Sequence, residues 1–457
     1  MLLASPYHLS LDPAESVVGK PFPPLAPLVS AAELQARGHS VAFYDATLVS
    51  HVDTFREALR GHRPTQVAIL SDPHSVPVKM CTLRQREAAL TMVRLSRAAG
   101  ASVLVAGPDP TDHAELYAAA GASHVVLGEH DGALLDWADG RLAPGITPRR
   151  ANTTHLDALP DPAWELVDLA AYAESWRRRH GRWELNVSTA RGCPYRCNWC
   201  AKPTWGRSYH VASPERVASQ IAATRERWRP DGLWFTDDIF AVKPSWLSTF
   251  RGLVGNDPLP FRCNTRADLV RDGAYVADLA AAGCREVWMG AESGSDSVLA
   301  AMDKDQTRAD IDTAVSRLRS AGIRVGFFLQ LGYPGERYDD VLATLDMVRS
   351  LRPDEIGISV SYPLPGTPFH DKVRDQLKRE NWESSMANEV LFAGAYPQPF
   401  YDAVREVLRA ESAWWTWRPG MDRAALRRLG ALPWHAARWP VHRAKMGWFG
   451  RIHPHSK

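Results

Sequence analysis

Two long runs of alternating strand and helix signals constrain this fold more than any other feature of the sequence. The first run occupies residues 1–140, where helical stretches such as the one ending at Gly100 separate short apolar segments. These segments are MLLAS (1–5), VAFYDAT (41–47), QVAILSD (66–72), SVLVAGP (102–108) and HVVLGEH (124–130). The repetition predicts a doubly wound parallel sheet of Rossmann-like type, which binds ligands at the carboxyl ends of its strands.

The second run extends from residue 184 to residue 375 and contains six strand–helix units. Its strands are expected in LNVSTARG (185–192), GLWFTDDIF (232–240), PFRCNTRAD (260–268), REVWMGAES (285–293), RVGFFLQLGYP (324–334) and EIGISVSYPLP (355–365). One helix opens with Ser213-Pro214, a capping residue followed by proline at the first helical position. Six units predict a partial (βα)6 barrel with its chemistry on the loops that follow the strands.

Two further segments complete the predicted organisation. Residues 141–183 are proline-rich and aperiodic, as in a linker. Residues 376–457 form a small C-terminal helical extension, rich in tryptophan and basic residues. From Arg418 onward nine Arg or Lys face a single acid, interleaved with Trp434, Trp439 and Trp448. This tail either contacts anionic lipid or closes over a substrate, or it is a solvated surface whose tryptophans pack on the barrel.

Composition is that of an ordinary soluble enzyme. The formal charge of +2 gives no general argument for binding nucleic acid. No run reaches the roughly 20 apolar residues of a membrane span, and the amino terminus lacks the basic and apolar regions of a secretory signal. Six cysteines in 457 residues suit a reducing compartment, so we expect a cytoplasmic protein with free thiols.

Three of the six cysteines lie within eight residues, in TARGCPYRCNWCAKP (189–203). Cys193, Cys197 and Cys200 can hold three irons of a [4Fe-4S] cluster and leave the fourth iron open to a ligand. Gly192 and Pro194 would give the loop a tight path. The alternatives are zinc with a fourth ligand such as His210, or free thiols, although zinc favours paired C-x2-C spacings. Cys81, Cys263 and Cys284 are interpreted as buried small residues.

The cysteine motif after a first barrel strand resembles that of the radical S-adenosylmethionine (radical SAM) superfamily, in which the open iron chelates the cofactor. The later strands support the resemblance. LWFTDDIF, RCNTRAD, GCREVWMGAESGSDSVLAAMDK, GYPGE (332–336) and PLPGTP (363–368) are similar to the second- to sixth-strand motifs of the branch that includes methylthiotransferases and cobalamin-binding members. The resemblance covers about residues 184–375.

The resemblance implies a set of S-adenosylmethionine contacts. Asp237 and Asp238 would lie near the amino group of the cofactor, and Glu292 and Ser293 near its ribose or carboxylate, with Lys304 a further candidate. Backbone at Gly332, Pro334 and Gly335 would approach the adenine, while Trp199 would contact the cofactor and shield the cluster. Structural roles stay open: either aspartate could cap the next helix, and Arg266 with Asp268 could form an ion pair.

The first 140 residues resemble the cobalamin-binding domain that precedes many radical SAM barrels. The resemblance would place Gly107, Pro108, Thr111, Gly128 and Glu129 around the corrin and its nucleotide tail. Domains that bind cobalt through histidine carry D-x-H-x-x-G after the first strand. Here that loop reads SPYHLSLDPAES, and the D-x-H at Asp72 and His74 follows the third strand instead. We therefore expect no histidine on the cobalt, with His8 and His74 ordinary loop residues. A domain that kept the fold but lost cobalamin is the alternative.

The family resemblance implies a cobalamin-dependent radical SAM enzyme that methylates an unactivated carbon of a small-molecule or lipid-like biosynthetic intermediate. It would take electrons from a flavodoxin- or ferredoxin-type donor, with no nucleic acid as partner and with peripheral membrane contact through the tail. One alternative is a radical SAM cyclase or oxidoreductase without methyl transfer. Another is an iron–sulfur electron-transfer or regulatory protein, which has no need of the GAESGSD and GYPGE motifs. A tRNA methylthiotransferase is disfavoured because the other cysteines are too scattered for a second cluster.

Overall fold

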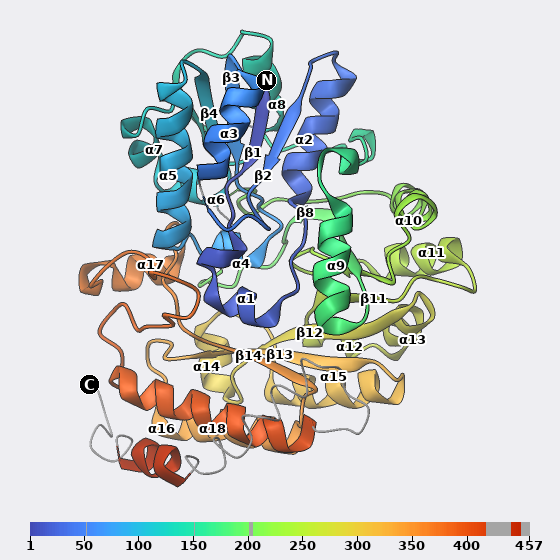
Figure 1. Ribbon diagram of the computed structural model, residues 1–457. Coiled ribbons are helices and arrows are strands. Elements are labelled where there is room, and N and C mark those ends of the chain that lie inside the picture. The colour runs from blue at the N-terminus through green and yellow to red at the C-terminus, as the bar shows by residue number, and fades with distance from the viewer. Residues whose placement is uncertain (52, 150, 201–203, 417–439, 449–457) are drawn as a thin grey trace.

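Two parallel β-sheets, one above the other, form the framework of the chain in the computed structural model (Figure 1). The structure describes residues 1–457 except 52, 150, 201–203, 417–439 and 449–457. Sheet A belongs to the N-terminal part and sheet B to the second run of strand–helix units, and each has six strands among the described residues. The predicted α/β class, with two parallel sheets in succession, is confirmed.

Sheet A is doubly wound, with strand order β2-β1-β3-β4-β5-β6 and parallel pairing throughout. The strands are β1 (Leu2–Ser5), β2 (Ala42–Asp45), β3 (Gln66–Leu70), β4 (Ser102–Ala106), β5 (His124–Val126) and β6 (Gly145–Thr147). One face packs on α2 (Leu25–Ala36) and α8 (Asp131–Ala138), and the other on α3 (Asp53–His62), α5 (Leu83–Ala98) and α7 (Ala114–Ala119). Short helices α1 (Pro13–Val18), α4 (Val76–Lys79) and α6 (Pro108–Asp112) lie in its loops.

The stretch interpreted as a linker, 141–183, contains regular structure. β6 pairs with β5 and extends sheet A beyond residue 140. α9 (Leu169–His180) begins at Asp168, whose side chain accepts a hydrogen bond from the amide of Ala171, and buries Trp176 completely. Three residues are too few to show strand periodicity, and the surrounding prolines obscured the helix signal.

Sheet B is an open half-barrel with strand order β14-β13-β12-β11-β10-β7, all parallel. Its strands are β7 (Glu184–Val187), β10 (Gly232–Phe235), β11 (Phe261–Thr265), β12 (Cys284–Glu292), β13 (Arg324–Leu331) and β14 (Glu355–Val360). The helices between them are α10 (Pro214–Trp228), α11 (Pro244–Val254), α12 (Ala267–Val270), α13 (Gly273–Ala281), α14 (Asp296–Ala301), α15 (Arg308–Ser320) and α16 (Tyr338–Leu351). The cap predicted for α10 is confirmed, because the Ser213 side chain accepts from the amide of Arg216.

Alternation along the strands of sheet B separates a helix-covered outer face from an inner face. On β12, Val287, Met289 and Ala291 are fully buried in the largest apolar core. Successive side chains of a strand point to opposite sides, so Glu286 and Trp288 lie on the inner face. The outer face therefore supplies the core of this half of the chain, and the inner face is free to carry chemistry.

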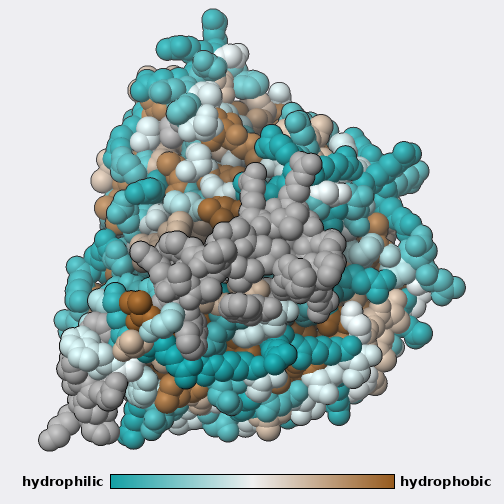
Figure 2. Space-filling model, turned by 60° about the horizontal axis from the view of Figure 1, so that its bottom comes forward, coloured by the Kyte–Doolittle hydropathy of each residue, from teal (hydrophilic) through white to brown (hydrophobic). Residues whose placement is uncertain are grey.

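The C-terminal segment ties the two sheets together. After α17 (Pro368–Val373) the chain returns to the N-terminal part, where the amide of Leu83 donates to the carbonyl of Trp382 at 2.9 Å. α18 (Gln398–Thr416) then packs beside α16 and the edge strand β14. No helix in the described part of the chain is long and apolar enough to cross a membrane. Apolar side chains appear only in small groups among charged ones on the face shown in Figure 2, outside its grey residues.

Candidate functional site

The cysteine loop begins and ends in a two-stranded antiparallel ribbon. β8 (Ala190–Gly192) pairs with β9 (Tyr209–Val211) at the carboxyl end of sheet B, and the cysteine loop connects these two strands, with 193–200 and 204–208 as its described residues. Gly192 has φ +80°, and a Cβ there would lie 2.1 Å from the carbonyl oxygen of Ser208. Only glycine fits this position, which explains the residue before the first cysteine.

None of the three cysteines of the loop forms a disulfide. Cys193 is buried, whereas Cys197 and Cys200 are partly exposed. Among the described residues no three His, Cys, Asp or Glu side chains are arranged to hold a single metal ion. That geometry gives no support to a zinc site with His210. A four-iron cluster holds its thiolates further apart than a single metal ion does. The spacing of side chains required for one ion is therefore not the spacing required for a cluster.

Asn198 fixes the centre of the cysteine loop. Its amide nitrogen donates to the Ala301 carbonyl at 2.8 Å, and its side-chain oxygen accepts from the Tyr333 hydroxyl at 2.6 Å. Its backbone accepts from the amide of Phe369. One residue therefore links the loop to three elements that follow strands of sheet B. Sequence reasoning missed Asn198, and its position between two cysteines was the only available signal.

Trp199 packs away from the solvent, against an apolar cluster that includes Met302 and Phe369. Its indole Nε1 is buried without a hydrogen-bond partner. Lys304 Nζ lies 5.7 Å from the centre of its ring. The ring is therefore partly buried beside the loop, and both its shielding of a cluster and its contact with S-adenosylmethionine stay predictions.

The two aspartates after β10 have separate roles. The Asp237 carboxylate accepts from the amides of Thr189 and Ala190, both at 2.8 Å, and from the hydroxyls of Ser188 and Thr189. Burial nevertheless raises its pKa to about 6. Asp238 instead pairs with Lys79 of α4 at 2.6 Å. Asp237 therefore anchors the strand that leads into the cysteine loop, and Asp238 connects sheet B to the N-terminal part.

Glu292 and Lys304 form a buried ion pair of 2.9 Å over the end of β12. Glu292 itself has φ +58°, an uncommon conformation for a non-glycine residue. A Cβ at Gly290 would lie 2.5 Å from both charged groups, so the pair requires a bare backbone there. The neighbouring Ser293 is held by Thr344, with 3.1 Å between the two hydroxyl oxygens.

The GYPGE segment turns after β13. Gly332 and Gly335 both have positive φ, and Gly335 has open space around it. Pro334 is half-buried between them. The amide of Gly332 donates to Glu336 at 2.6 Å, and burial raises the pKa of that carboxyl to about 8. The predicted adenine-contacting backbone thus lies at the same end of sheet B as the cysteine loop.

Positive side chains surround the cysteine loop and fit a group held by thiolates. Arg266 donates to Cys197 Sγ at 3.6 Å, and Lys304 lies over Trp199. Burial alone would lower the pKa of Lys79, but Asp238 and the nearby Cys200 sulfur keep it above its ordinary value. Nearby cations stabilise thiolates, the form in which cysteine binds metal. The donor set therefore suits an iron–sulfur cluster.

The residues predicted around cobalamin gather at the carboxyl edge of sheet A. Gly107 and Pro108 lead from β4 into α6, and Thr111 Oγ1 accepts from the amide of Gly128 at 3.0 Å. At Gly107, with φ +120°, a Cβ would lie 2.5 Å from the Ser71 carbonyl oxygen. Unpartnered buried polar atoms occur on loops at this edge: His8 Nε2, Asp112 Oδ2 and His130 Nδ1. Such atoms suit a large ligand with polar side chains.

The D-x-H at Asp72 serves the fold. The Asp72 carboxylate accepts from the amide of Leu25, the first residue of α2, at 2.7 Å and from that of His74 at 3.0 Å. The His74 ring packs on Trp205 of the cysteine loop, with centroids 4.9 Å apart, and burial puts its pKa well below the ordinary value. His8 Nδ1 lies 3.3 Å from the Val49 carbonyl oxygen.

Arg191, which sequence reasoning missed, joins the two candidate sites. It lies two residues before Cys193 and forms ion pairs with Glu129 and Asp131, and all three side chains are buried. Glu129 also accepts from the amide of Thr153 at 2.8 Å. The edge of sheet A and the cysteine loop are therefore held together by charge in the protein interior.

The inner face of sheet B has an aromatic centre. The Trp288 and Phe328 rings lie 4.8 Å apart, and Phe328 is 37% exposed although it is in the middle of a central strand. A Cβ at Gly326 would lie 2.7 Å from the Trp288 ring, so glycine lets that ring lie against β13. Trp288 Nε1 donates to Glu286 at 2.9 Å, which fixes its orientation.

Comparison with known proteins finds a family model and relatives similar to this chain. The family model "Radical SAM superfamily" matches residues 187–348. A bacteriochlorophyllide d C-12(1)-methyltransferase of Chlorobaculum tepidum is 23% identical over 301 residues, 63% of each chain. An anaerobic magnesium-protoporphyrin IX monomethyl ester cyclase of Cereibacter sphaeroides is 26% identical over 41% of this chain and 32% of its own. The chain thus spans less than two thirds of either relative.

Two solved structures share the fold over nearly the whole chain. The radical S-adenosylmethionine methyltransferase TsrM from Kitasatospora setae, with cobalamin and a [4Fe-4S] cluster bound, has a TM-score of 0.69 at 18% identity and covers 99% of this chain and 98% of its own. OxsB, a cobalamin-dependent radical enzyme with aqua-cobalamin bound, has a TM-score of 0.71 at 15% identity and covers 97% and 72%. The match to the radical SAM family model is thus confined to residues 187–348, and the fold of both sheets is that of these two proteins.

Proposed function

We propose that the chain is a cobalamin-dependent radical SAM enzyme that methylates a carbon of a small-molecule or lipid-like biosynthetic intermediate. The observation that carries this proposal is the buried junction of Arg191 with Glu129 and Asp131, which holds the ligand-binding edge of sheet A against the cysteine loop. A cluster, S-adenosylmethionine and cobalamin would supply the radical and methyl-transfer chemistry when bound there.

The chain's own residues would hold these groups at two neighbouring edges. Cys193, Cys197 and Cys200 would bind the cluster, with Asn198 keeping their loop in place. Glu292, paired with Lys304, and the backbone around Gly335 would contact S-adenosylmethionine, because they lie at and just after the carboxyl ends of β12 and β13. Asp237, Asp238 and Ser293 are already hydrogen-bonded within the protein and would orient the site from behind.

At the edge of sheet A, Gly107, Pro108, Thr111 and Gly128 would border the cobalamin. The Asp72 carboxylate is occupied by amides, and the His74 ring is occupied by Trp205. These contacts support the prediction that the histidine of the D-x-H segment is not a ligand of the cobalt. Glu129 would affect the cobalamin site indirectly, by holding Arg191 in place, since its carboxylate is ion-paired with that residue.

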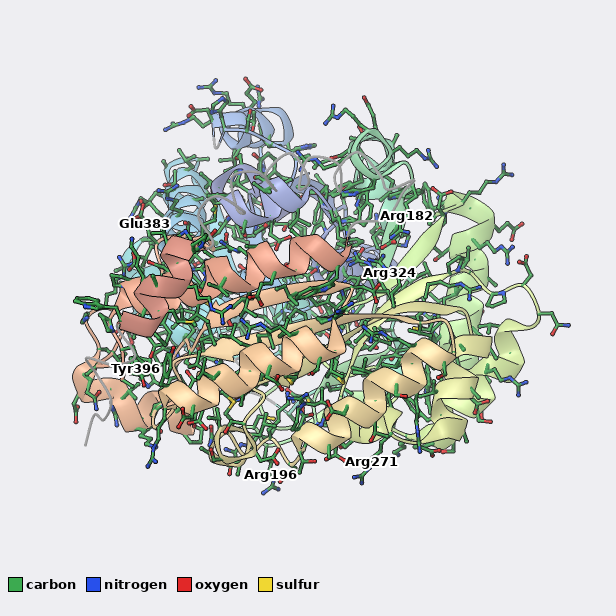
Figure 3. All side chains as sticks on the ribbon, turned by 90° about the horizontal axis from the view of Figure 1, so that it is seen from below. Arg182, Arg196, Arg271, Arg324, Glu383 and Tyr396 are labelled. Atoms are coloured by element: carbon green, nitrogen blue, oxygen red, sulfur yellow. The ribbon has the colours of Figure 1, made fainter. Side chains whose placement is uncertain are left out.

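The inner face of sheet B would receive the substrate. Trp288 and Phe328 offer apolar ring surface. Two ion pairs close the end of this face where the strands begin: Glu184 with Arg262, and Glu286 with Arg324. Figure 3 shows Arg196 of the cysteine loop at the lower rim of that view, apart from Arg182 and Arg324. A substrate with an apolar, ring-bearing part fits this surface.

A radical cyclase or oxidoreductase is the second candidate, favoured by the cyclase from Cereibacter sphaeroides among the relatives. Its site would use the same cysteines and the same inner face. A flavodoxin- or ferredoxin-type electron donor serves both candidates. The proposed membrane contact of the tail falls mainly on residues outside the described part, including Trp434 and Trp439. Residues 440–448 are described, and Trp448 among them is 56% exposed.

The decisive experiment measures metals and the fate of the methyl group together. The full chain is purified without oxygen, its cluster is reconstituted, and hydroxocobalamin is offered and the excess removed. About one cobalt per chain, and transfer of deuterium from methyl-labelled S-adenosylmethionine to a carbon acceptor, are expected. Cobalt without label transfer, but with deoxyadenosine formed, would favour the cyclase class.

A Cys193→Ala, Cys197→Ala, Cys200→Ala variant should lose iron yet retain cobalt. Loss of both iron and cobalt in this variant would contradict two separate sites.

A further inference from the structure

A guanidinium group lies inside the protein against one of the cluster cysteines. Arg266 follows β11 and is 1% exposed. Its Nε donates to Asp268 at 2.8 Å, one terminal nitrogen donates to the backbone carbonyl of Lys304, and the other donates to Cys197 Sγ at 3.6 Å. The expected Arg266–Asp268 ion pair is present, but its cation is also bonded to sulfur.

The same pair holds a second residue of the cysteine loop. The guanidinium carbon of Arg266 lies 3.8 Å from the centre of the Tyr195 ring, and the Tyr195 hydroxyl donates to Asp268 at 3.3 Å. The donors on all three Arg266 nitrogens are thus directed at protein atoms. A planar guanidinium fixed in this way keeps one orientation toward Cys197, so its charge acts on the sulfur at a constant distance.

We propose that Arg266 tunes the reduction potential of the cluster through Cys197, with Asp268 as the opposing charge. This inference rests on the proposed function, which supplies the cluster. A one-electron transfer from a low-potential reductant adds one negative charge to the cluster and neither forms nor breaks a bond. A fixed cation and a hydrogen bond to a ligand sulfur stabilise the reduced form more than the oxidised form, which raises the potential.

The test is a potentiometric titration of the reconstituted full chain, followed by electron paramagnetic resonance with dithionite and mediators. Arg266→Gln is expected to move the midpoint to more negative values, so that the ratio of reduced to oxidised cluster at the wild-type midpoint falls about tenfold. Asp268→Asn keeps an acceptor for Arg266 but removes the opposing charge, and should move the midpoint the other way. Arg271→Gln, at an exposed pair with Asp310 after the same short helix, should leave it unchanged.

Iron and sulfide content separate tuning from folding of the loop. Arg266→Gln with full iron and a wild-type midpoint would overturn the inference. If Arg266→Gln loses iron, the Asp268→Asn midpoint decides: a positive shift supports tuning, and an unchanged or negative one overturns it. A wild-type chain that takes up no iron would refute the cluster itself, and with it the inference.

Discussion

Sheets A and B have the same parallel pairing but bury their faces differently. In sheet A, Leu3, Val67 and Leu104 are fully buried and helices cover both faces. In sheet B, Val287 and Phe327 are equally buried, whereas Phe328 on the inner face is 37% exposed. Both-sided burial confines the chemistry of sheet A to its strand ends. Sheet B can use its strand ends and a whole concave face.

The junction between the two sheets should be the most sensitive point of this arrangement. Replacing Arg191 by Met would leave Glu129 and Asp131 buried without their cation. Removing one partner of a buried ion pair costs about 3–5 kcal/mol, so we expect a loss of that size in urea denaturation, with loss of bound iron.

Arg196→Met is the matched control, because Arg196 is exposed on the same loop. It should change neither stability nor iron content. If both variants had the same free energy of unfolding and the same iron content, other contacts would hold the two sheets together. The ion pairs of Arg191 would then not be what joins the two edges.

Truncating one residue in each sheet tests the difference in burial directly. Leu104→Ala removes a side chain that is fully buried in sheet A and should lower the free energy of unfolding by about 2–5 kcal/mol. Phe328→Ala on the inner face of sheet B should cost less than about 2 kcal/mol because water already reaches the ring.

The second readout of this pair is function. Phe328→Ala should reduce turnover while iron and cobalt content stay at wild-type levels, since the ring packs on Trp288 of the neighbouring strand of sheet B. A stability loss for Phe328→Ala as large as that for Leu104→Ala would mean that the inner face is a closed core, and would remove the surface proposed for the substrate.

The sequence predicted both sheets because each consists of short apolar runs separated by helical stretches. QVAIL in β3 and VWMGA in β12 are runs of this kind, and both are recognisable without a structure. The cysteine spacing and the glycine before it likewise follow from local geometry. The loop glycine, the cap of α10 and the Arg266–Asp268 pair are all present as expected.

The contacts between sheets could not be read in the same way. Lys79 with Asp238 is separated by 159 positions, and Arg191 with Glu129 by 62. No periodicity relates such pairs, and each residue alone looks like an ordinary surface charge. Their meaning depends on burial, which only the packed structure supplies. Asn198 is similar, since its partners come from three segments that follow three different strands.

Buried acids at both strand edges should destabilise the fold as the pH rises. Burial raises the pKa of Asp72 of sheet A although its carboxylate accepts from several amides, and burial raises the pKa of Glu336 of sheet B, which accepts from one amide, to about 8. Between its ordinary value of 4.5 and about 8 the folded chain holds a proton there that the unfolded chain has lost. This contribution to stability is complete below pH 4.5 and disappears as the pH rises through 8.

Glu336→Gln keeps an acceptor for the amide of Gly332 and cannot ionise. Thermal denaturation across that pH window should therefore show a smaller loss of stability in the variant than in the wild type. Parallel curves for the two proteins would indicate that Glu336 is ionised in the folded chain, contrary to the environment seen around it.

The smallest effect is expected at the edge of sheet B that α18 covers. Arg349 of α16 donates to both carboxylate oxygens of Glu411 at 2.7 and 2.8 Å, and Arg349 is partly exposed. Such pairs contribute little, so Glu411→Gln should lower the free energy of unfolding by less than about 1 kcal/mol. Val404, Val407 and Leu408 on the same helix are fully buried, and Leu408→Ala should cost more. If Glu411→Gln instead lowered the free energy of unfolding as much as Leu408→Ala, α18 would be held on the edge of sheet B mainly by charge. That attachment would weaken in salt, unlike the apolar packing that closes both faces of sheet A.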